Sequence, residues 1–157
     1  MAATRPARPG EAAGLTALCL RSKAHWGYDA EFMQLCVPSL TVEEQSIAEG
    51  RVLVAIDGTG RTAGTVSVGR DGDDAELALM FVEPAAMGGG TGRQLFEAAV
   101  ALARELGYRR MTILADVNAA PFYERMGARF LRNEPSDAIP GRVLPFYEYD
   151  LTSGASS

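Results

Sequence analysis

The sequence predicts a single α/β domain in which a sheet of mixed strand directions is flanked by helices. Three observations lead to this fold class. Helical periodicity dominates the first fifty residues, β-branched runs separated by turn residues follow over 51–70, and a strand, a helix and a strand succeed one another over 75–117. The succession of a strand, a helix and a strand over 75–117 implies a right-handed crossover between two parallel strands. With 157 residues the chain has the length of one domain that buries an ordinary core.

The N-terminal part predicts three helices. The first begins near Pro9, and its apolar residues fall on one helical face: Ala12, Leu15, Leu18 and Cys19. Residues 29–36 predict a second helix. Thr41 and Glu44 have the spacing of a capping box, which predicts a third helix over 41–50.

The middle of the chain changes to strand patterns. Residues 51–58 and 62–70 are rich in β-branched residues and are separated by Asp and Gly, so we expect a hairpin. Residues 75–84 follow a short polar turn and predict a third strand of the same meander. We therefore expect three consecutive antiparallel strands here.

The C-terminal half predicts the crossover and the rest of the sheet. Residues 90–106 carry an apolar stripe of helical period that ends before a glycine, 111–117 form a short strand, and 119–126 form a short helix. Two further strand-like runs at 128–134 and 143–151 complete the sheet. Residues 1–151 are thus expected to form one domain, with 152–157 as a disordered tail.

Charge and composition exclude several classes of function. The formal net charge is −5, from 20 acidic and 15 basic side chains, so the electrostatic footprint of a nucleic-acid-binding protein is missing. No run approaches the ~20 apolar residues that span a bilayer, and no signal peptide is evident, so we expect no membrane contact and a cytoplasmic location. Cys19 and Cys36 lack a CxxC motif or a Cys/His cluster, which favours buried free thiols and no metal.

The most informative motif is PAAMGGGTGRQL, residues 84–95, which joins a strand to a helix. Its glycines let the backbone bend around a ligand, and the helix N-terminus directs peptide N–H groups at an anion. The loop therefore predicts a phosphate site. A P-loop would need Lys and Ser/Thr after the last glycine, where this chain has Arg93 and Gln94, and a dinucleotide fingerprint would need a third glycine at the right step. A flexible surface loop is the plain alternative.

Residues 82–99, VEPAAMGGGTGRQLFEAA, resemble the acetyl-CoA-binding motif of the GNAT superfamily of N-acetyltransferases. Val82, Pro84, Gly90 and Gly92 align with the motif, whereas Met87 stands where Gln or Arg is usual. The resemblance implies that acetyl-CoA is the co-substrate and that its pyrophosphate meets the backbone of this loop. The residues implied are Met87, Gly88, Gly89, Gly90, Thr91, Gly92 and Arg93.

A second segment, ADVNAAPFYERMGARF at 115–130, is similar to another segment of the same superfamily. By this resemblance Asn118 contacts the cofactor, and Tyr123 lies near the thioester sulfur. Asn118 precedes Tyr123 by five residues, where seven is commoner. Tyr123 is then the candidate general acid, since its hydroxyl is a donor and is neutral at pH 7. The alternative for Tyr123 is a core aromatic residue beside Phe122.

The resemblance also implies an architecture. It is a mixed, mostly antiparallel sheet of about six to seven strands flanked by helices, in which the parallel strands 75–84 and 111–117 splay apart. Peptide groups of Met80, Phe81 and Val82 would then pair with the pantetheine arm, and a free N–H would stabilise the developing oxyanion.

The acceptor side is expected at the two ends of the chain. Residues 22–32 and 139–151 also look like segments of a bacterial branch of the superfamily, which places His25, Trp26, Tyr28 and Arg142 beside the acceptor. The alternatives are an aromatic cluster that caps the core and, for Arg142, a solvated loop charge. An alkyl amine with a pKa of roughly 10 needs a proton acceptor. The candidates are Glu76, Asp116 and His25, with Glu76 favoured.

The sequence thus predicts an acetyl-CoA-dependent N-acetyltransferase that acts on a primary amine of an unidentified small molecule or peptide. A homodimer would suit the superfamily. The competing hypothesis is a non-catalytic module that senses acyl-CoA.

Overall fold

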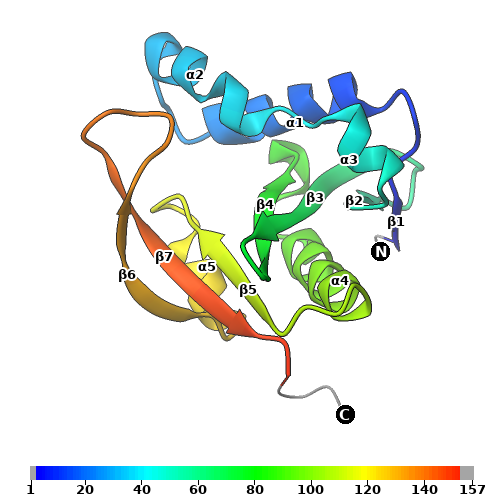
Figure 1. Cartoon of the computed structure of the whole chain (residues 1–157). Coiled ribbons are helices and arrows are strands. Elements are labelled where there is room, and N and C mark those ends of the chain that lie inside the picture. Colours follow the sequence, from blue (N-terminus) through cyan, green and yellow to red (C-terminus); the bar gives the residue numbers. More distant parts are fainter. Residues whose placement is uncertain (1–2, 153–157) are drawn as a thin grey trace.

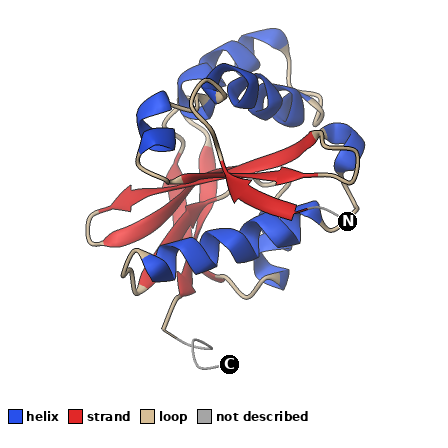
Figure 2. Ribbon diagram, turned by 90° about the vertical axis from the view of Figure 1, so that its right-hand side faces the viewer, coloured by secondary structure: helices blue, strands red, loops and turns tan. Residues whose placement is uncertain are grey.

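The computed structural model describes residues 3–152 and forms three layers, a central sheet with helices on both faces (Figures 1 and 2). The strands are β1 (Ala3–Pro6), β2 (Val52–Ile56), β3 (Thr62–Asp71), β4 (Asp74–Val82), β5 (Arg110–Leu114), β6 (Arg129–Pro135) and β7 (Val143–Asp150). The helices are α1 (Ala12–Ala24), α2 (Ala30–Cys36), α3 (Glu44–Ala48), α4 (Thr91–Glu105) and α5 (Ala120–Arg125), with short 3₁₀ turns η1 (Val37–Leu40) and η2 (Pro84–Ala86).

The seven strands lie in the order β1-β2-β3-β4-β5-β7-β6. Every neighbouring pair is antiparallel except β4 and β5, which are parallel. The helix between those two strands is α4, as the crossover requires. The predicted fold class is confirmed.

The parallel pair touches over a short stretch only. The paired residues are Ala75 with Met111 and Glu76 with Thr112, after which no β4–β5 pairing continues among the described strands. On its other side β4 stays paired with β3 as far as Val82. The sheet therefore splits along its middle, between the C-terminal parts of β4 and β5 (Figure 1).

A bulge interrupts β4 next to this split. Ser67 of β3 pairs with Leu79 and Val68 pairs with Leu77, which leaves Ala78 without a partner in the ladder. A bulge of this kind reverses the alternation of side chains along a strand. Accordingly Leu77 and Met80 both pack on the α4 face, whereas Leu79 packs on the opposite face.

Each face of the sheet has its own apolar core. On one face α4 and α5 pack onto the strands through residues such as Leu95, Phe96 and Tyr123. On the other face the N-terminal helices pack through residues such as Leu15 and Ile47. Candidate functional residues lie on both faces, with Tyr123 on the first and Glu76 on the second.

Two expectations from the sequence were wrong. The helix predicted over 41–50 is shorter, because the Thr41 hydroxyl donates to the Val37 carbonyl oxygen instead of capping it. The Glu44 carboxylate caps α1, where it accepts from the N–H groups of Gly10 and Ala12 at 3.0–3.1 Å. Strand β1 was not anticipated, since its four residues pair only with the distant β2.

None of the helices in the described part of the chain is both long and apolar enough to cross a membrane. Of the tail predicted at 152–157, all but Thr152 lies outside the described residues.

Candidate active site

The glycine loop after β4 has a backbone that other residues adopt only under strain. Gly88 has φ 84° and Gly90 has φ 86°, both in the left-handed region. A Cβ built on either residue meets no atom within 4 Å, so the space in front of the loop is open. Gly90 is the N-cap of α4. The loop thus presents bare backbone to open space at the start of a fifteen-residue helix.

Several peptide N–H groups of this loop lack acceptors. The N–H groups of Gly88, Gly89 and Gly90 donate to no acceptor within residues 3–152. The first N–H groups of α4, from Thr91 to Arg93, have no intrahelical acceptor because they begin the helix. Met87 differs, since its N–H donates to the Pro84 carbonyl at 3.3 Å. A row of free donors from Gly88 to Arg93, reinforced by the helix dipole, is a site for an anion.

The loop is held beside the split in the sheet. A Cβ on Gly92 would lie 3.5 Å from the Phe122 ring and 3.8 Å from Cε of Met80. Gly92 therefore packs between α5 and β4. The exposed Arg93 guanidinium adds a positive charge beside the loop, and its Nε lies 3.4 Å from the Glu97 carboxylate.

Tyr123 lies deep between α4 and the strands. It is 6% exposed, and its ring packs against Phe96 and Phe122 at centroid distances of 6.1 and 5.3 Å. Burial, with a smaller effect from the Asp116 charge, raises the pKa of Tyr123. Its hydroxyl has no hydrogen-bond partner within residues 3–152. Since every fully buried side-chain N or O atom there is paired, this hydroxyl reaches open space. Tyr123 is both a core aromatic and a neutral donor.

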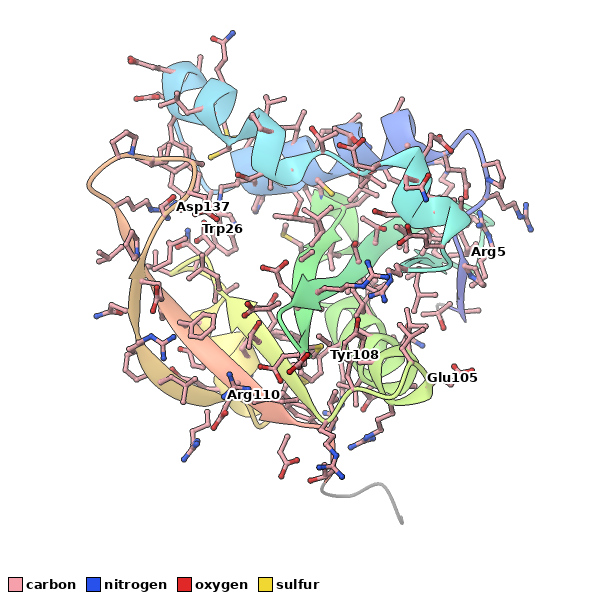
Figure 3. The ribbon with its side chains drawn as sticks, in the orientation of Figure 1. Arg5, Trp26, Glu105, Tyr108, Arg110 and Asp137 are labelled. Carbon is pink, nitrogen blue, oxygen red and sulfur yellow. The ribbon has the colours of Figure 1, made fainter. Side chains whose placement is uncertain are left out.

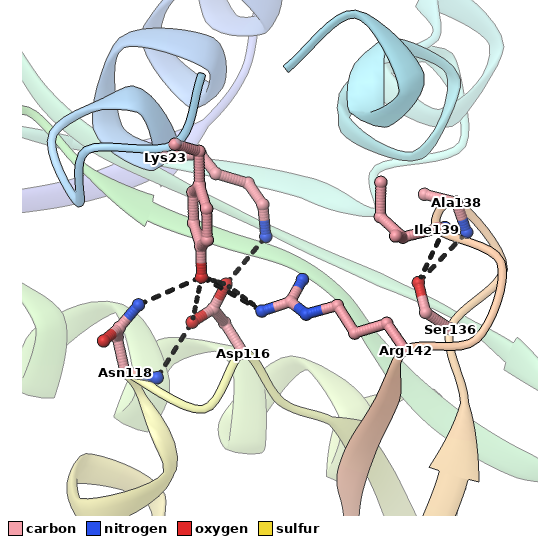
Figure 4. A network of polar contacts seen from close by, with 8 residues as sticks. Lys23, Asp116, Asn118, Ser136, Ala138, Ile139 and Arg142 are labelled. Atoms are coloured by element: carbon pink, nitrogen blue, oxygen red, sulfur yellow. Dashed lines mark hydrogen bonds and ion pairs between the residues drawn. The ribbon is translucent and has the colours of Figure 1, made fainter. Parts of the chain in front are cut away.

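A polar network centred on Asp116 closes the C-terminal end of β5 (Figure 4). The Asp116 carboxylate accepts from Lys23 Nζ at 2.8 Å and from the Tyr28 hydroxyl at 2.9 Å, and Arg142 Nη2 lies 3.5 Å away. The Tyr28 hydroxyl in turn accepts from Asn118 Nδ2 at 3.1 Å and from Arg142 Nη2 at 3.0 Å. The network joins the end of α1, the segment before α2, the end of β5 and the β6–β7 loop.

The charges of the network fix its protonation. Burial alone would raise the pKa of Asp116, but the hydrogen bonds from Lys23 and from the Asn118 N–H prevail and lower it to about 2. Burial and the neighbouring Asp116 raise the pKa of Tyr28. Asp116 is therefore ionised and already bonded to cations. It is a poor proton acceptor, which weighs against its role as general base.

The environment of Glu76 disfavours the ionised carboxylate, in contrast to that of Asp116. Glu76 lies on the sheet face of the N-terminal helices, because its neighbours Ala75 and Leu77 pack on the α4 face. Burial and the negative charges of Asp71 and Asp137 raise the pKa of Glu76. A raised pKa makes the ionised carboxylate a stronger base.

The structure brings some of the predicted acceptor residues together and leaves others apart. Tyr28 and Arg142 are hydrogen-bonded, although 114 residues separate them. Trp26, labelled in Figure 3, directly follows the C-cap of α1 and is 51% exposed. Its ring meets the His25 ring edge to face. Neither His25 nor Trp26 takes part in the Asp116 network.

Two members of the site were missed from the sequence. Phe32 stacks on Tyr28 at 4.1 Å, and the Arg142 guanidinium lies 5.0 Å from the Phe32 ring. Lys23, 9% exposed, holds Asp116. The sequence offered a clue to Lys23, because it follows Cys19 by four residues and so lies on the apolar face of α1. It offered no clue to Phe32.

The β6–β7 loop that carries Arg142 is closed by a hydrogen bond from the Ser136 N–H to the Arg142 carbonyl at 2.8 Å. The Ser136 Oγ accepts from the N–H groups of Ala138 and Ile139 at 3.2 and 3.1 Å, and both residues pack against the core of the N-terminal helices.

Across residues 3–152 no group of three or more His, Cys, Asp or Glu side chains is arranged to hold a metal. Both cysteines are buried free thiols.

Comparison with known proteins finds a family model and solved structures that both concern GNAT acetyltransferases. The model of a family described as an acetyltransferase (GNAT) domain matches residues 48–127. Among solved structures, a GCN5-related N-acetyltransferase from Rhodopseudomonas palustris superposes with a TM-score of 0.75 at 24% identity, covering 94% of each chain. A comparison with curated protein sequences gave no match.

Two other similar structures contain the cofactor. The PaiA N-acetyltransferase of Thermoplasma acidophilum, in complex with coenzyme A, superposes with a TM-score of 0.74 at 12% identity and covers 96% of this chain and 99% of its own. The putative acetyltransferase YncA of Salmonella typhimurium, with acetyl-CoA, reaches 0.71 at 22% identity, covering 100% and 98%.

Proposed function

The chain belongs to the GNAT acetyltransferase family and is an acyltransferase, and from this premise we propose that it transfers the acetyl group of acetyl-CoA directly to a primary amine of a small molecule or peptide. The observation that carries the proposal is the glycine loop. It lines up free N–H groups from Gly88 to Arg93 at the start of α4, beside the split between β4 and β5.

The residues of the loop fit the pyrophosphate of acetyl-CoA. The N–H donors come from Gly88, Gly89, Gly90, Thr91, Gly92 and Arg93, and Gly88 and Gly90 leave open space before them. Met87 contributes its apolar side chain, since its N–H already donates to Pro84. Asn118 donates through Nδ2 to Tyr28. Its Oδ1 takes part in no hydrogen bond within residues 3–152, so it stays available as an acceptor for the cofactor.

The split fits the pantetheine arm. Met80, Phe81 and Val82 lie on β4 beyond its last pairing with β5, so their peptide groups on that side can pair with the amides of the arm. An N–H of the same segment can also stabilise the negative charge that develops on the carbonyl oxygen during attack. Acetyl-CoA supplies the activated thioester, and β4 holds it in line with an incoming amine.

The chain supplies the proton transfers. Glu76 takes the proton that the amine loses as its nitrogen bonds to the acetyl carbon. The Tyr123 hydroxyl lies on the other face of the sheet and donates to the sulfur as the carbon–sulfur bond breaks. The raised pKa of Glu76 suits its role, because it makes the carboxylate a better base, and Tyr123 carries the proton that it donates at pH 7.

The acceptor approaches from the side of the N-terminal helices. Tyr28 and Arg142 fix the entrance between the α1–α2 connection and the β6–β7 loop, and His25 and Trp26 offer exposed rings beside it. Aromatic rings attract an ammonium through their negative faces. The proposal therefore assigns substrate contact to these rings.

The experiment that tests the proposal measures the release of free CoA thiol from acetyl-CoA with a panel of amines. We expect amine-dependent release, and we expect acetyl-CoA at 100 times its Kd to stabilise the fold by about 2.7 kcal/mol. Stabilisation without release for any amine would identify a sensor module instead. The absence of both, in a folded protein, would contradict acetyl-CoA as the co-substrate.

A further inference from the structure

The Tyr28 hydroxyl uses its full hydrogen-bonding capacity inside the Asp116 network. Its oxygen lies 2.9 and 3.2 Å from the two carboxylate oxygens of Asp116, 3.1 Å from Asn118 Nδ2 and 3.0 Å from Arg142 Nη2. A tyrosine hydroxyl can donate one hydrogen bond and accept two. One carboxylate and two nitrogen donors fill that capacity. The hydroxyl therefore has no hydrogen bond left to give to a ligand.

The direction of each of these hydrogen bonds is fixed by charge. Against the effect of burial, the hydrogen bonds from Lys23 Nζ and from the Asn118 N–H hold the pKa of Asp116 at about 2, so its carboxylate can only accept. The Arg142 guanidinium carries no acceptor atom and can only donate. Burial and the Asp116 charge raise the pKa of Tyr28, so its hydroxyl keeps its single proton and gives it to Asp116. Toward Asn118 the Tyr28 oxygen is therefore an acceptor only.

This polarity determines which way the Asn118 amide faces. Nδ2 must face the Tyr28 oxygen, because the reverse orientation would set Oδ1 against an oxygen whose only proton is already given to Asp116. Oδ1 is thus turned away from Asp116, as Figure 4 shows. It takes part in no hydrogen bond within residues 3–152. Asn118 therefore offers an acceptor oxygen whose orientation is set by Tyr28.

The backbone of Asn118 is held as well as its amide. Its N–H donates to Asp116 Oδ1 at 2.8 Å, and the Asp116 carbonyl accepts from the N–H groups of Ala119 and Ala120 at 2.9 and 3.1 Å. The Asn118 residue itself is exposed. Without the hydrogen bond to Tyr28, its side chain would rotate in water. The backbone turn places Asn118, and Tyr28 selects one rotamer of its side chain.

Asn118 stands beside the proposed path of the pantetheine arm. It follows the C-terminal end of β5, Leu114, by four residues, and β5 bounds the split in the sheet that the arm would occupy. The arm contains amide N–H groups, which are hydrogen-bond donors. The phosphates of acetyl-CoA are ionised at neutral pH and can only accept. A free carbonyl oxygen such as Asn118 Oδ1 is therefore complementary to the arm and not to the phosphates.

We propose that Tyr28 is a positioning residue for the cofactor, whose hydroxyl turns Asn118 Oδ1 toward the pantetheine arm, where it accepts from an amide N–H. The inference rests on the proposed function. Lys23 and Asp116 act one step further back, since they fix the proton of Tyr28. Arg142 occupies the second acceptor position of the same hydroxyl. The β6–β7 loop and the cofactor contact therefore depend on one oxygen atom.

The test is a double-mutant cycle on the Kd of acetyl-CoA, measured by titration calorimetry without an acceptor amine. Tyr28→Phe keeps the ring that stacks on Phe32 and frees the Asn118 amide. It should raise the Kd roughly two- to tenfold, the cost of ordering one free side chain on binding. Asn118→Ala should raise the Kd at least as much. In the Asn118→Ala background, Tyr28→Phe should have no further effect, because no amide is left to orient.

The cycle has a matched variant and a matched ligand as controls. The Tyr147 hydroxyl also donates to a carboxylate, that of Glu124 at 2.6 Å, so Tyr147→Phe removes the same kind of hydrogen bond. It should lower the melting temperature and leave the Kd of acetyl-CoA unchanged. The ligand 3′-phospho-ADP is coenzyme A without the pantetheine arm. Neither Tyr28→Phe nor Asn118→Ala should change its Kd.

Three results would overturn the inference while leaving acetyl transfer intact. The first is a Kd of acetyl-CoA that Tyr28→Phe leaves unchanged. The second is an equal rise in that Kd with and without the Asn118 side chain, which would mean that Tyr28 acts by another route. The third is a rise for 3′-phospho-ADP as large as that for acetyl-CoA. A wild-type protein that binds no acetyl-CoA would instead count against the proposed function itself.

Discussion

The Tyr28 hydroxyl donates to the Asp116 carboxylate at 2.9 Å, across 88 residues of sequence. The bond ties the segment between α1 and α2 to the end of β5. Together with Lys23 and Arg142, it encloses one carboxylate among two cations. Removal of the central charge should therefore leave two largely buried cations without compensation.

Asp116→Asn should lower the free energy of unfolding by about 3–5 kcal/mol at pH 7. The pH dependence should change as well. Because the pKa of Asp116 in the folded protein is about 2, below its ordinary value, the stabilisation is complete above about pH 4 and is lost as the pH falls toward 2. Urea unfolding between pH 2 and 7 measures both effects. A variant with the same acid sensitivity as wild type would show that Asp116 does not govern it.

Gly90→Val should abolish stabilisation by acetyl-CoA. Its side chain would occupy the open space before the loop, and its left-handed φ would add about 1–2 kcal/mol of strain. Gly60→Val is the matched control, since Gly60 has φ 87° and open space in the β2–β3 turn. Thermal shifts with and without acetyl-CoA separate strain from binding. Equal shifts for both variants would show that the loop does not hold the cofactor.

Tyr123→Phe should reduce kcat by about 10²-fold and leave the melting temperature nearly unchanged, because the lost hydroxyl has no protein partner in the described part of the chain. Tyr147→Phe is the reciprocal control. The Tyr147 hydroxyl donates to Glu124 at 2.6 Å, so its loss should lower stability without lowering kcat. Unchanged turnover in Tyr123→Phe would assign the proton donor to water or to another group.

Trp26→Ala should raise the acceptor KM several-fold and leave the KM for acetyl-CoA unchanged. Because the side chain is about half exposed and has no role in the Asp116 network, little stability should be lost. Steady-state kinetics with the best amine from the panel, together with a melting curve, provide the measurement. If only the melting temperature falls, the ring is a packing residue of the helix end.

The elements of the fold could be predicted because their patterns are local. The apolar stripe of α4 and the β-branched runs of β2 and β3 set period and length within each segment. The errors arose where distant residues compete for the same group. Glu44 has the spacing to cap its own helix, but the N–H groups of Gly10 and Ala12 take its carboxylate.

The same distinction between local and distant residues decides which parts of the candidate site could be predicted. The glycine loop is a contiguous motif and could be located from the sequence. The Asp116 network could not, because four separate segments meet there, and no spacing in the chain predicts that Arg142 lies 3.0 Å from the Tyr28 hydroxyl. Lys23 was the one available clue, as a cation on an apolar helical face must find a buried partner.

The short pairing of β4 with β5 has a consequence for the handling of the protein. Beyond Glu76 and Thr112 the two strands present open edges to each other inside the sheet, and open strand edges are templates for strands of other chains. A pantetheine arm in the proposed position would cover both edges with its amides, much as an inserted strand would. Protein purified without cofactor would then be the more prone to aggregation, and acetyl-CoA in the buffer would act as a solubilising agent.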